Sequence, residues 1–161
     1  MAANNMQICL WYDDQAEEAV NLYTSIFKDS SVGSVSRFGK EGFEHHGKPE
    51  GSVMTIDFSL NGMKFIALNG GPIFKFNEAM SIIIHCNSQE EIDHYWQSLS
   101  DGGEECPCGW LKDKFGVSWQ ITPANLNYYL GHSDPLKRSK ALTAMFQMKK
   151  FEIALLEEAI Q

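Results

Sequence analysis

Two polar side chains interrupt an aromatic and apolar run in the second half of this chain. Ser118 and Gln120 stand two residues apart in Val117-Ser118-Trp119-Gln120-Ile121. Alternate side chains of a strand share a face, so Ser118 and Gln120 point to one side and Trp119 to the other. A hydroxyl and an amide can both donate and accept hydrogen bonds, which suits a neutral polar ligand. We predict that this polar face lines a cavity; the alternative is that it meets solvent and Trp119 faces the cavity.

Histidines offer a second kind of chemistry. His45 and His46 occur near Glu41 and Glu44, a composition that resembles a metal cluster, but the segment also contains glycine and proline and is typical of a solvated loop. His85, near the end of a predicted strand, has the ring of a general base. A single strand histidine is more often a hydrogen-bonded structural residue, and the sequence names no carboxylate partner for it.

The thiols are few. The four cysteines are Cys9, Cys86, Cys106 and Cys108. They are too scattered for a disulfide framework, so we expect free thiols in a reducing compartment. Cys106-Pro107-Cys108 places two thiols on one side of an extended segment, a pattern of redox or soft-metal pairs, but no second pair stands at zinc spacing. Both are therefore interpreted as small buried residues, with Cys108 a candidate for lining a pocket.

Composition limits the partners. The chain has 161 residues, 43% of them apolar, enough for one globular domain. Its net charge of −8 repels nucleic acids and anionic membranes, so neither is expected as a partner. No run approaches the roughly 18 apolar residues of a membrane span, and the start MAANNMQ lacks the basic and apolar segments of a secretion signal. We predict a cytoplasmic protein.

The hydrophobic pattern predicts the same order of elements twice. The first half is expected to hold a strand, a helix and three strands, over 6–12, 15–27, 31–38, 53–60 and 63–68. Asn61-Gly62 joins the last two as a hairpin, because both residues accept positive φ. The second half repeats this order over 80–86, 88–99, 105–108, 110–114 and 117–122. A shift of 73 positions, 83 − 10 = 73, superimposes Leu10 on Ile83 and Tyr23 on Trp96.

The remainder of the chain reads as helical. Asp134-Pro135 is a capping residue followed by proline at the first helical position, and the apolar spacing beyond it suits two amphipathic helices. We therefore divide the chain into a first βαβββ unit with its connector at 1–76, a second at 77–123 and a helical extension at 124–161. Open sheets that cannot bury a face alone are expected to pair, giving one structural domain.

Four segments resemble a known family. They are Leu10-Trp11-Tyr12 with Gln15-Ala16-Glu17-Glu18-Ala19, then Pro49-Glu50-Gly51-Ser52-Val53-Met54-Thr55, then 67–77 (ALNGGPIFKFN), and 108–120 (CGWLKDKFGVSWQ). With the tandem βαβββ pattern, they resemble the PhnB-like branch of the vicinal-oxygen-chelate superfamily, which includes glyoxalase I, extradiol dioxygenases and bleomycin-resistance proteins. The resemblance implies an α+β fold, a cup-shaped mixed sheet built from both units, and a homodimer.

The resemblance also implies where a metal would bind. Metal-using relatives take two ligands from each unit, and those positions fall here on Ile8 (or Gln7 with a slip of one), Ile66 or Ala67, Ser81, and Gln120. None is histidine, aspartate or glutamate, the donors that divalent transition metals use. We therefore expect neither a metal nor another cofactor, although an amide oxygen can ligate a metal.

Aromatic residues supply the remaining site candidates. Trp11, Trp110, Phe74 and Phe76 fall on strands or on the connector that would border the cup, and an aromatic cavity with a few polar groups is the usual form of a small-molecule site. The same rings could instead fill the core of a small domain. With these rings the predicted pocket comprises Gln120, Ser118, Ser81, Trp11, Trp110, Phe74, Phe76, Cys108 and His85.

Several functions fit such a pocket. The first is metal-free binding of a small, largely apolar molecule, and the second is a metal-free enzyme of unknown reaction. A metal-dependent lyase or dioxygenase would require ligands that the carried-over positions lack. Members of the branch often carry the name 3-demethylubiquinone-9 3-methyltransferase, yet the parallel strands and early glycine-rich turn of a common S-adenosylmethionine fold are absent from this pattern.

Overall fold

A computed structural model describes residues 6–161 of the chain. Residues 1–5, part of the segment in which no secretion signal is expected, lie outside the described residues. The chain divides into two compact units at the bond between Lys75 and Phe76, and each is described by itself. Within the described residues, no helix has the length and apolar character needed to cross a bilayer.

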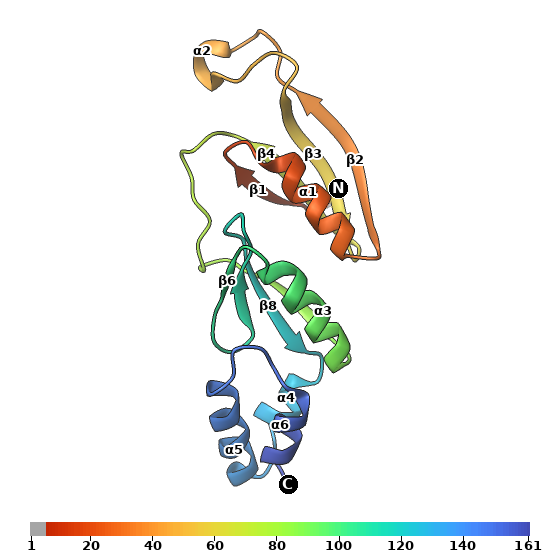
Figure 1. Cartoon of the computed structure of the whole chain (residues 1–161), viewed down its shortest axis with the longest axis vertical. Coiled ribbons are helices and arrows are strands. Elements are labelled where there is room, and N and C mark those ends of the chain that lie inside the picture. Colours follow the sequence, from red (N-terminus) through yellow and green to blue (C-terminus); the bar gives the residue numbers. More distant parts are fainter. Residues whose placement is uncertain (1–5) are drawn as a thin grey trace, which may run out of the picture. The chain divides into compact units, whose positions relative to one another are not determined.

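The first unit is a four-stranded mixed sheet with one long helix. Its elements are β1 Ile8–Tyr12, α1 Ala16–Ile26, β2 Ser30–Arg37, α2 Phe43–His46, β3 Val53–Leu60 and β4 Met63–Asn69. The strand order is β1-β4-β3-β2, with β1 parallel to β4 and the other pairs antiparallel. α1 lies along one face of this sheet (Figure 1). The predicted hairpin is confirmed, since Asn61 and Gly62 have φ of 47° and 79° between β3 and β4.

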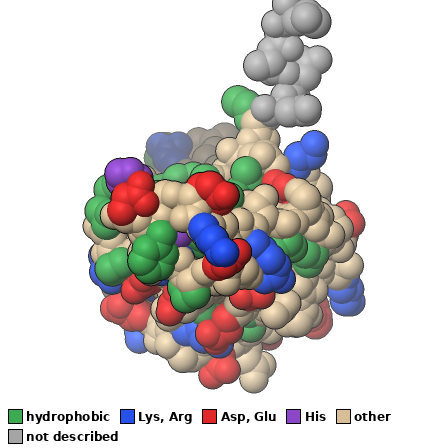
Figure 2. All heavy atoms as spheres, turned by 90° about the horizontal axis from the view of Figure 1, so that it is seen from above, with side chains coloured by type: hydrophobic (Ala, Val, Ile, Leu, Met, Phe, Trp, Pro, Cys, Tyr) green, Lys and Arg blue, Asp and Glu red, His purple; other side chains and the backbone are tan. Residues whose placement is uncertain are grey.

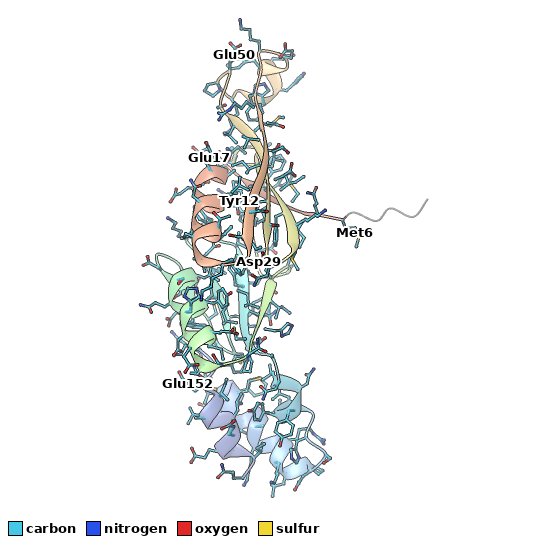
Figure 3. All side chains as sticks on the ribbon, turned by 90° about the vertical axis from the view of Figure 1, so that its right-hand side faces the viewer. Met6, Tyr12, Glu17, Asp29, Glu50 and Glu152 are labelled. Carbon is cyan, nitrogen blue, oxygen red and sulfur yellow. The ribbon has the colours of Figure 1, made fainter. Side chains whose placement is uncertain are left out.

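Burial in this unit follows the face that α1 covers. Leu10, Phe65 and Ala67 are buried on that side, together with Tyr12, whose hydroxyl lies 3.3 Å from the hydroxyl of Tyr23 on α1. Tyr12 is labelled in Figure 3 beside this helix. The opposite face of the sheet is left open by the unit's own elements, and its side chains are only partly buried. In the space-filling view of Figure 2, acidic and basic side chains are interspersed over the visible surface of the molecule.

The second unit repeats the topology and adds three helices. Its elements are β5 Ile82–Cys86, α3 Gln89–Ser100, β6 Glu104–Glu105, β7 Trp110–Lys112, β8 Ser118–Pro123, α4 Leu126–Leu130, α5 Pro135–Phe146 and α6 Ile153–Ala159. The strand order β5-β8-β7-β6 and the single parallel pair, β5 with β8, match the first unit. Ser88 is the N-cap of α3, and its hydroxyl accepts from the Glu91 N–H as expected of a capping residue.

The α+β fold with two tandem βαβββ units is confirmed, but the predicted repeat shift needs one correction. The helices obey the shift of 73, because α1 and α3 start at Ala16 and Gln89. The first strands obey 74, since β1 and β5 start at Ile8 and Ile82. Superimposing Leu10 on Ile83 was therefore wrong: Leu10 is 5% exposed and Ile83 is 47% exposed. The loop after β5 is one residue shorter than the loop after β1, and a one-residue slip exchanges the faces of a strand.

The C-terminal helices are attached to the second sheet by its β6–β7 connection. Cys108 and Gly109 donate backbone hydrogen bonds to the carbonyls of Met148 and Lys149 at 2.8 and 2.7 Å. Both residues adopt positive φ, so the strand predicted over 105–108 is shorter than expected and ends at Glu105. The predicted cap of α5 is confirmed, because Asp134 accepts from the Leu136 N–H at 2.8 Å.

Candidate functional site

The second unit's sheet has one covered and one open face. On the covered face, Trp119, Ile121 and Leu111 are fully buried beneath α3. Strand alternation puts Trp110, Lys112, Ser118 and Gln120 on the other face, where Trp110 pairs with Gln120 and Lys112 with Ser118 in register. The polar side chains singled out from the sequence thus share the open face.

A cavity of about 250 Å³ lies on this open face. Its lining residues are Glu78, Cys106, Pro107, Trp110, Leu111, Lys112 and Ser118. The floor comes from β7 and the start of β8, and one side comes from the turn after β6. At about 30 Å³ of liquid volume per water, the space corresponds to about eight water molecules, which sets the scale of a small ligand.

Ser118 is the most unusual group of this cavity. Its side chain is 2% exposed, and no group among residues 6–161 makes a hydrogen bond with its Oγ. An unpaired buried hydroxyl costs about 1–3 kcal/mol relative to a paired one. A residue that lines a cavity and has an unused donor and acceptor is a natural contact for a bound polar group.

A second polar pair lies on the same face. Gln120 Nε2 donates to Ser81 Oγ at 2.8 Å, and both side chains are half-buried. This bond uses one amide hydrogen and one hydroxyl lone pair, so the pair can still present the Ser81 O–H donor and the Gln120 Oε1 acceptor. The open face therefore carries the uncharged hydrogen-bonding side chains of Ser81, Ser118 and Gln120.

Lys112 brings a compensated charge to the cavity. Its ammonium forms ion pairs with Glu78 and, at 3.6 Å, with Glu104. The hydrogen bond with Glu78 raises the pKa of Lys112 and lowers the pKa of Glu78 from their ordinary values. These carboxylates face water, so the pairs contribute little to stability. They leave Lys112 charged at the cavity without a net positive field.

The other predicted site residues of the second unit do not line this cavity, although strand alternation puts His85 on the same open face as Gln120. Cys108 donates its thiol toward the Met145 carbonyl oxygen at 3.7 Å and does not line the cavity. His85 is exposed, and its Nδ1 lies 3.3 Å from the hydroxyl of Thr122, which fits a hydrogen-bonded structural residue. Phe76 packs at Gly116, where an added Cβ would lie 3.8 Å from the Phe76 Cβ.

Two predicted aromatics form their own cluster in the first unit. Trp11 meets Phe74 edge to face with ring centroids 4.9 Å apart, and its Nε1 donates to the Gly71 carbonyl at 2.8 Å. A Cβ on Gly70 would lie 2.2 Å from the Trp11 ring, so the glycine makes room for the indole. Phe74 is 61% exposed. This cluster and the cavity belong to different units, and their joining into one cup stays a prediction.

The four carried-over ligand positions do not fit a metal. In the first unit, Ala67 is fully buried on the α1 side, whereas Gln7 donates to Asp57 Oδ1 at 3.3 Å on the open face. Under the strand shift of 74, Gln7 of the first unit is equivalent to Ser81 of the second. The sheet registers likewise make Ile66 equivalent to Gln120.

The open-face positions are thus two amides, one hydroxyl and one alkyl group, without a charged donor. Asp57 adjoins the two positions of the first sheet, and it is already bound by Gln7 and by the Ser34 hydroxyl. Residues 6–161 contain no cluster of three or more histidine, cysteine or acidic side chains that could hold a metal ion.

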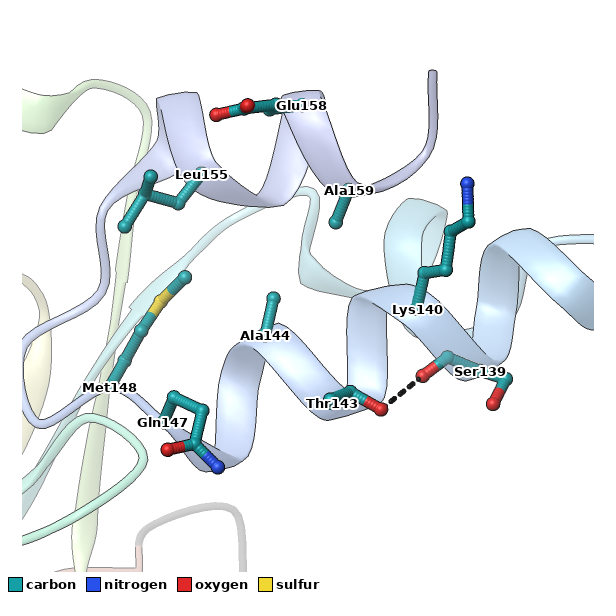
Figure 4. A pocket seen from close by; sticks show the side chains of 9 residues that line it. All are labelled: Ser139, Lys140, Thr143, Ala144, Gln147, Met148, Leu155, Glu158 and Ala159. Atoms are coloured by element: carbon teal, nitrogen blue, oxygen red, sulfur yellow. Dashed lines mark hydrogen bonds between the residues drawn. The ribbon is translucent and has the colours of Figure 1, made fainter.

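A second cavity lies between α5 and α6 (Figure 4). It encloses about 580 Å³, and Ala144, Met148, Leu155 and Ala159 form its apolar walls. Lys140 and Glu158 stand at its edges. Its polar side chains are on the solvent side, and Thr143 already donates to the Ser139 carbonyl at 2.9 Å. The cavity lacks the buried, unpaired polar group that marks the space beside Ser118.

Some residues that line the cavity beside Ser118 were not predicted from the sequence. Glu78 and Lys112 were not predicted, and Cys106 was interpreted as a small buried residue, whereas it is half-buried at the cavity. The available signal was alternation: Lys112 is two residues after Trp110, so both must share a face of β7. The contribution of Glu78 could not be deduced, because it depends on the path of the connector.

Comparison with known proteins now places the fold. Two four-stranded mixed sheets of βαβββ type define the glyoxalase/bleomycin-resistance fold of the vicinal-oxygen-chelate superfamily. Within it, residues 4–122 match the family described as 3-demethylubiquinone-9 3-methyltransferase. The chain belongs to this PhnB-like family, and the resemblance predicted from the sequence is confirmed.

Solved structures of other proteins have the same fold. A putative 3-demethylubiquinone-9 3-methyltransferase, PhnB protein, from Bacillus cereus is 35% identical, with TM-score 0.66, over 75% of this chain and 100% of that one. Protein PA1353 from Pseudomonas aeruginosa is 18% identical, with TM-score 0.57, over 74% and 98%. The fosfomycin resistance protein FosX from Listeria monocytogenes, solved with Mn(II) and sulfate, is 20% identical, with TM-score 0.51, over 75% and 92%. The last two show the fold alone. Among curated proteins, none matches this sequence.

Proposed function

We propose that this protein binds a small, largely apolar molecule that carries a neutral polar group, and that it does so without a metal. The observation that carries the proposal is the buried, unpaired hydroxyl of Ser118 in a cavity with Trp110 as an aromatic wall. An apolar pocket with a few placed polar groups is the usual form of a small-molecule site.

The donors in and beside the cavity support a neutral ligand. Ser118, Ser81 and Gln120 are uncharged, and the charge of Lys112 is already matched by Glu78 and Glu104. An anionic ligand would have to displace a carboxylate, and a cationic one would meet the Lys112 ammonium. A carbonyl or hydroxyl group avoids both costs and can use the free Ser118 hydroxyl.

The methyltransferase name of the family does not follow from this architecture. Each sheet has one parallel pair and two antiparallel pairs, whereas the common S-adenosylmethionine fold is a doubly wound parallel sheet with a glycine-rich turn after its first strand. Here the first turn is Asp13-Asp14-Gln15. The sheets give no support to a nucleotide-type cofactor site of that kind.

The wider proposal retains the expectations that came from the family resemblance. It includes Trp11, Phe74 and Phe76 as further aromatic walls, His85 and Cys108 at the margin, assembly as a homodimer and a cytoplasmic location. A dimer is checked by light scattering at micromolar concentration, where a monomer mass of 18.2 kDa would contradict it.

The binding test uses two compounds with the same carbon skeleton. Propiophenone and n-propylbenzene share the ring and three-carbon chain, but only the ketone has a hydrogen-bond acceptor. Two-dimensional ¹H–¹⁵N NMR titration should show saturable shifts at the Trp110 indole and around Ser118 with propiophenone, and about tenfold weaker binding of propylbenzene.

Variants locate the binding. Ser118→Ala should bring the affinity for propiophenone down to that for propylbenzene, whereas Ser31→Ala, an exposed strand serine in the first unit, should leave it unchanged. Equal affinities for the two compounds in the unaltered protein, or shifts confined to residues outside the cavity, would contradict the proposal.

A further inference from the structure

We propose that Cys106 is the reactive group of this cavity and forms a thioether with α,β-unsaturated carbonyl compounds bound there. This inference rests on the proposed binding function and names the class of ligand. It makes the cavity a covalent capture site for small electrophiles, with Ser118 holding the carbonyl oxygen and Trp110 packing against the apolar part.

Backbone geometry directs Cys106 into the cavity. Its N–H donates to the Trp110 carbonyl at 2.9 Å, which continues the pairing of β6 with β7 by one residue. Glu105, the residue before, sends its carboxylate to Trp96 Nε1 at 2.8 Å on the side of α3. Alternation therefore turns the Cys106 thiol to the opposite, open side, where it lines the same cavity as Ser118.

None of the other three thiols lines this cavity. Burial, with a smaller effect of the Glu91 charge, raises the pKa of Cys86 to about 12. Desolvation also raises the pKa of Cys9 above its ordinary value. Cys108 donates its S–H to the Met145 carbonyl and does not line the cavity. Because the thiolate is the nucleophile, the raised pKa values hold back Cys86 and Cys9, whereas Cys108 lies outside the cavity.

Cys106 has a cation nearby instead. Lys112 lines the same cavity, and its pKa is raised chiefly by the hydrogen bond to Glu78 and in smaller part by the negative charge of Cys106. The Lys112 ammonium and the Cys106 side chain thus line one cavity. Glu78 and Glu104 form ion pairs with the same ammonium.

The reaction balances without an added oxidant or reductant. The Cys106 thiol gives its proton to water, and the thiolate sulfur forms a bond to the β-carbon while the carbon–carbon π bond breaks. The electron pair moves to the carbonyl oxygen, where the Ser118 hydroxyl donates a hydrogen bond to the developing oxyanion. A proton from water then reaches the α-carbon, so thiol and enone together give one thioether ketone.

The test uses phenyl vinyl ketone, the unsaturated counterpart of propiophenone. Intact-protein mass spectrometry follows adduct formation, and peptide mapping assigns the site. We expect one adduct at Cys106, with a rate that saturates with ketone concentration and falls when propiophenone competes. Cys106→Ser should remove the saturable phase, whereas Cys9→Ser should leave it intact. A linear, uncompeted rate at Cys106, equal to that of N-acetylcysteine, would overturn the inference.

Ser118→Ala separates positioning from reactivity. It should slow addition of phenyl vinyl ketone about tenfold. Methyl methanethiosulfonate has no carbonyl group and reads thiolate reactivity directly, so its rate at Cys106 should not change. Equal slowing of both reagents would contradict the role given to Ser118. If propiophenone binds saturably but phenyl vinyl ketone spares Cys106, the binding proposal stands and this inference falls; if neither is bound, both fall.

Discussion

The carboxylate of Asp113 accepts a hydrogen bond from the indole Nε1 of Trp119 at 2.9 Å in the core of the second unit. Its other oxygen accepts the backbone N–H groups of Phe115 and Val117 at 2.9 and 3.0 Å. Asp113 is only 3% exposed. One side chain thus shapes the turn between β7 and β8 and fixes the indole of Trp119, the residue after Ser118, so the start of the polar strand face depends on it.

Asp113→Asn should therefore destabilise the protein by about 1–3 kcal/mol. An amide has only one acceptor oxygen, so either orientation directs an N–H donor at the Trp119 indole or at the two backbone donors. Urea denaturation followed by tryptophan fluorescence measures the change. Asp101→Asn, at an exposed aspartate after α3, should alter the unfolding free energy little. Equal effects of the two substitutions would remove the special role of Asp113.

Asn69 holds the start of α1 from the end of β4. Its Oδ1 accepts the Ala16 N–H at 2.9 Å, and its Nδ2 donates to the Val53 carbonyl at 3.0 Å, while Gln15 at the N-cap position makes no side-chain cap. Asn69→Ala leaves a helix N–H and a strand carbonyl unpaired inside the unit. We expect a loss of about 2–3 kcal/mol in thermal or urea unfolding. Asn21→Ala, on the exposed side of α1, is the matched control and should change the unfolding free energy by close to zero.

Local turns and caps could be predicted from the sequence, whereas contacts between distant segments could not. The Asn61-Gly62 hairpin and the Ser88 cap were predictable because their signals lie within a few residues of the structure they cause. Asn69 and Ala16 are 53 positions apart, so the cap depends on the completed sheet. Sequence offered no reason to connect them.

The candidate site divides in the same way. Alternation was enough to put Ser118 and Gln120 on one face, away from Trp119. It could not show that Ser118 has no partner, nor that Cys106 belongs to the same cavity, because both depend on β6–β7 pairing and on the connector at Glu78. The wrong superposition of the first strands had a local cause. The loop after β5 is one residue shorter than the loop after β1, and a single repeat shift applied to the whole unit does not show this difference.

Gly109 is required where the C-terminal segment meets the second sheet. It has φ of 79°, and a Cβ there would lie 2.4 Å from the Phe151 ring and 2.8 Å from the Ile121 carbonyl oxygen. Gly62 has the same φ with nothing within 4 Å of the added atom. Gly62→Ala should therefore cost only the conformational penalty of about 1–2 kcal/mol, and Gly109→Ala clearly more. Thermal unfolding of both variants separates strain from collision; equal losses would contradict the packing argument.

The contact of Lys150 with Asp93 on α3 predicts a pH dependence. Lys150 donates to Asp93, which chiefly lowers the pKa of Asp93, and the same bond chiefly raises the pKa of Lys150. A lowered carboxyl pKa gives stability that is present above the unfolded value of about 3.9 and is lost as the pH falls through the folded value. A raised lysine pKa gives stability that is present below about 10.4 and is lost as the pH rises through the folded value.

Lys150→Met should consequently cost most between about pH 5 and pH 9. Both side chains are partly exposed, so the expected loss there is about 0.5 kcal/mol. The difference from the unaltered protein should shrink toward both ends of the range, as measured by urea unfolding at each pH. Lys149→Met, at the exposed neighbour, should show no such window. A difference between Lys150→Met and the unaltered protein that stays constant from pH 3 to pH 11 would mean that packing of the Lys150 stem, not its charge, stabilises this contact.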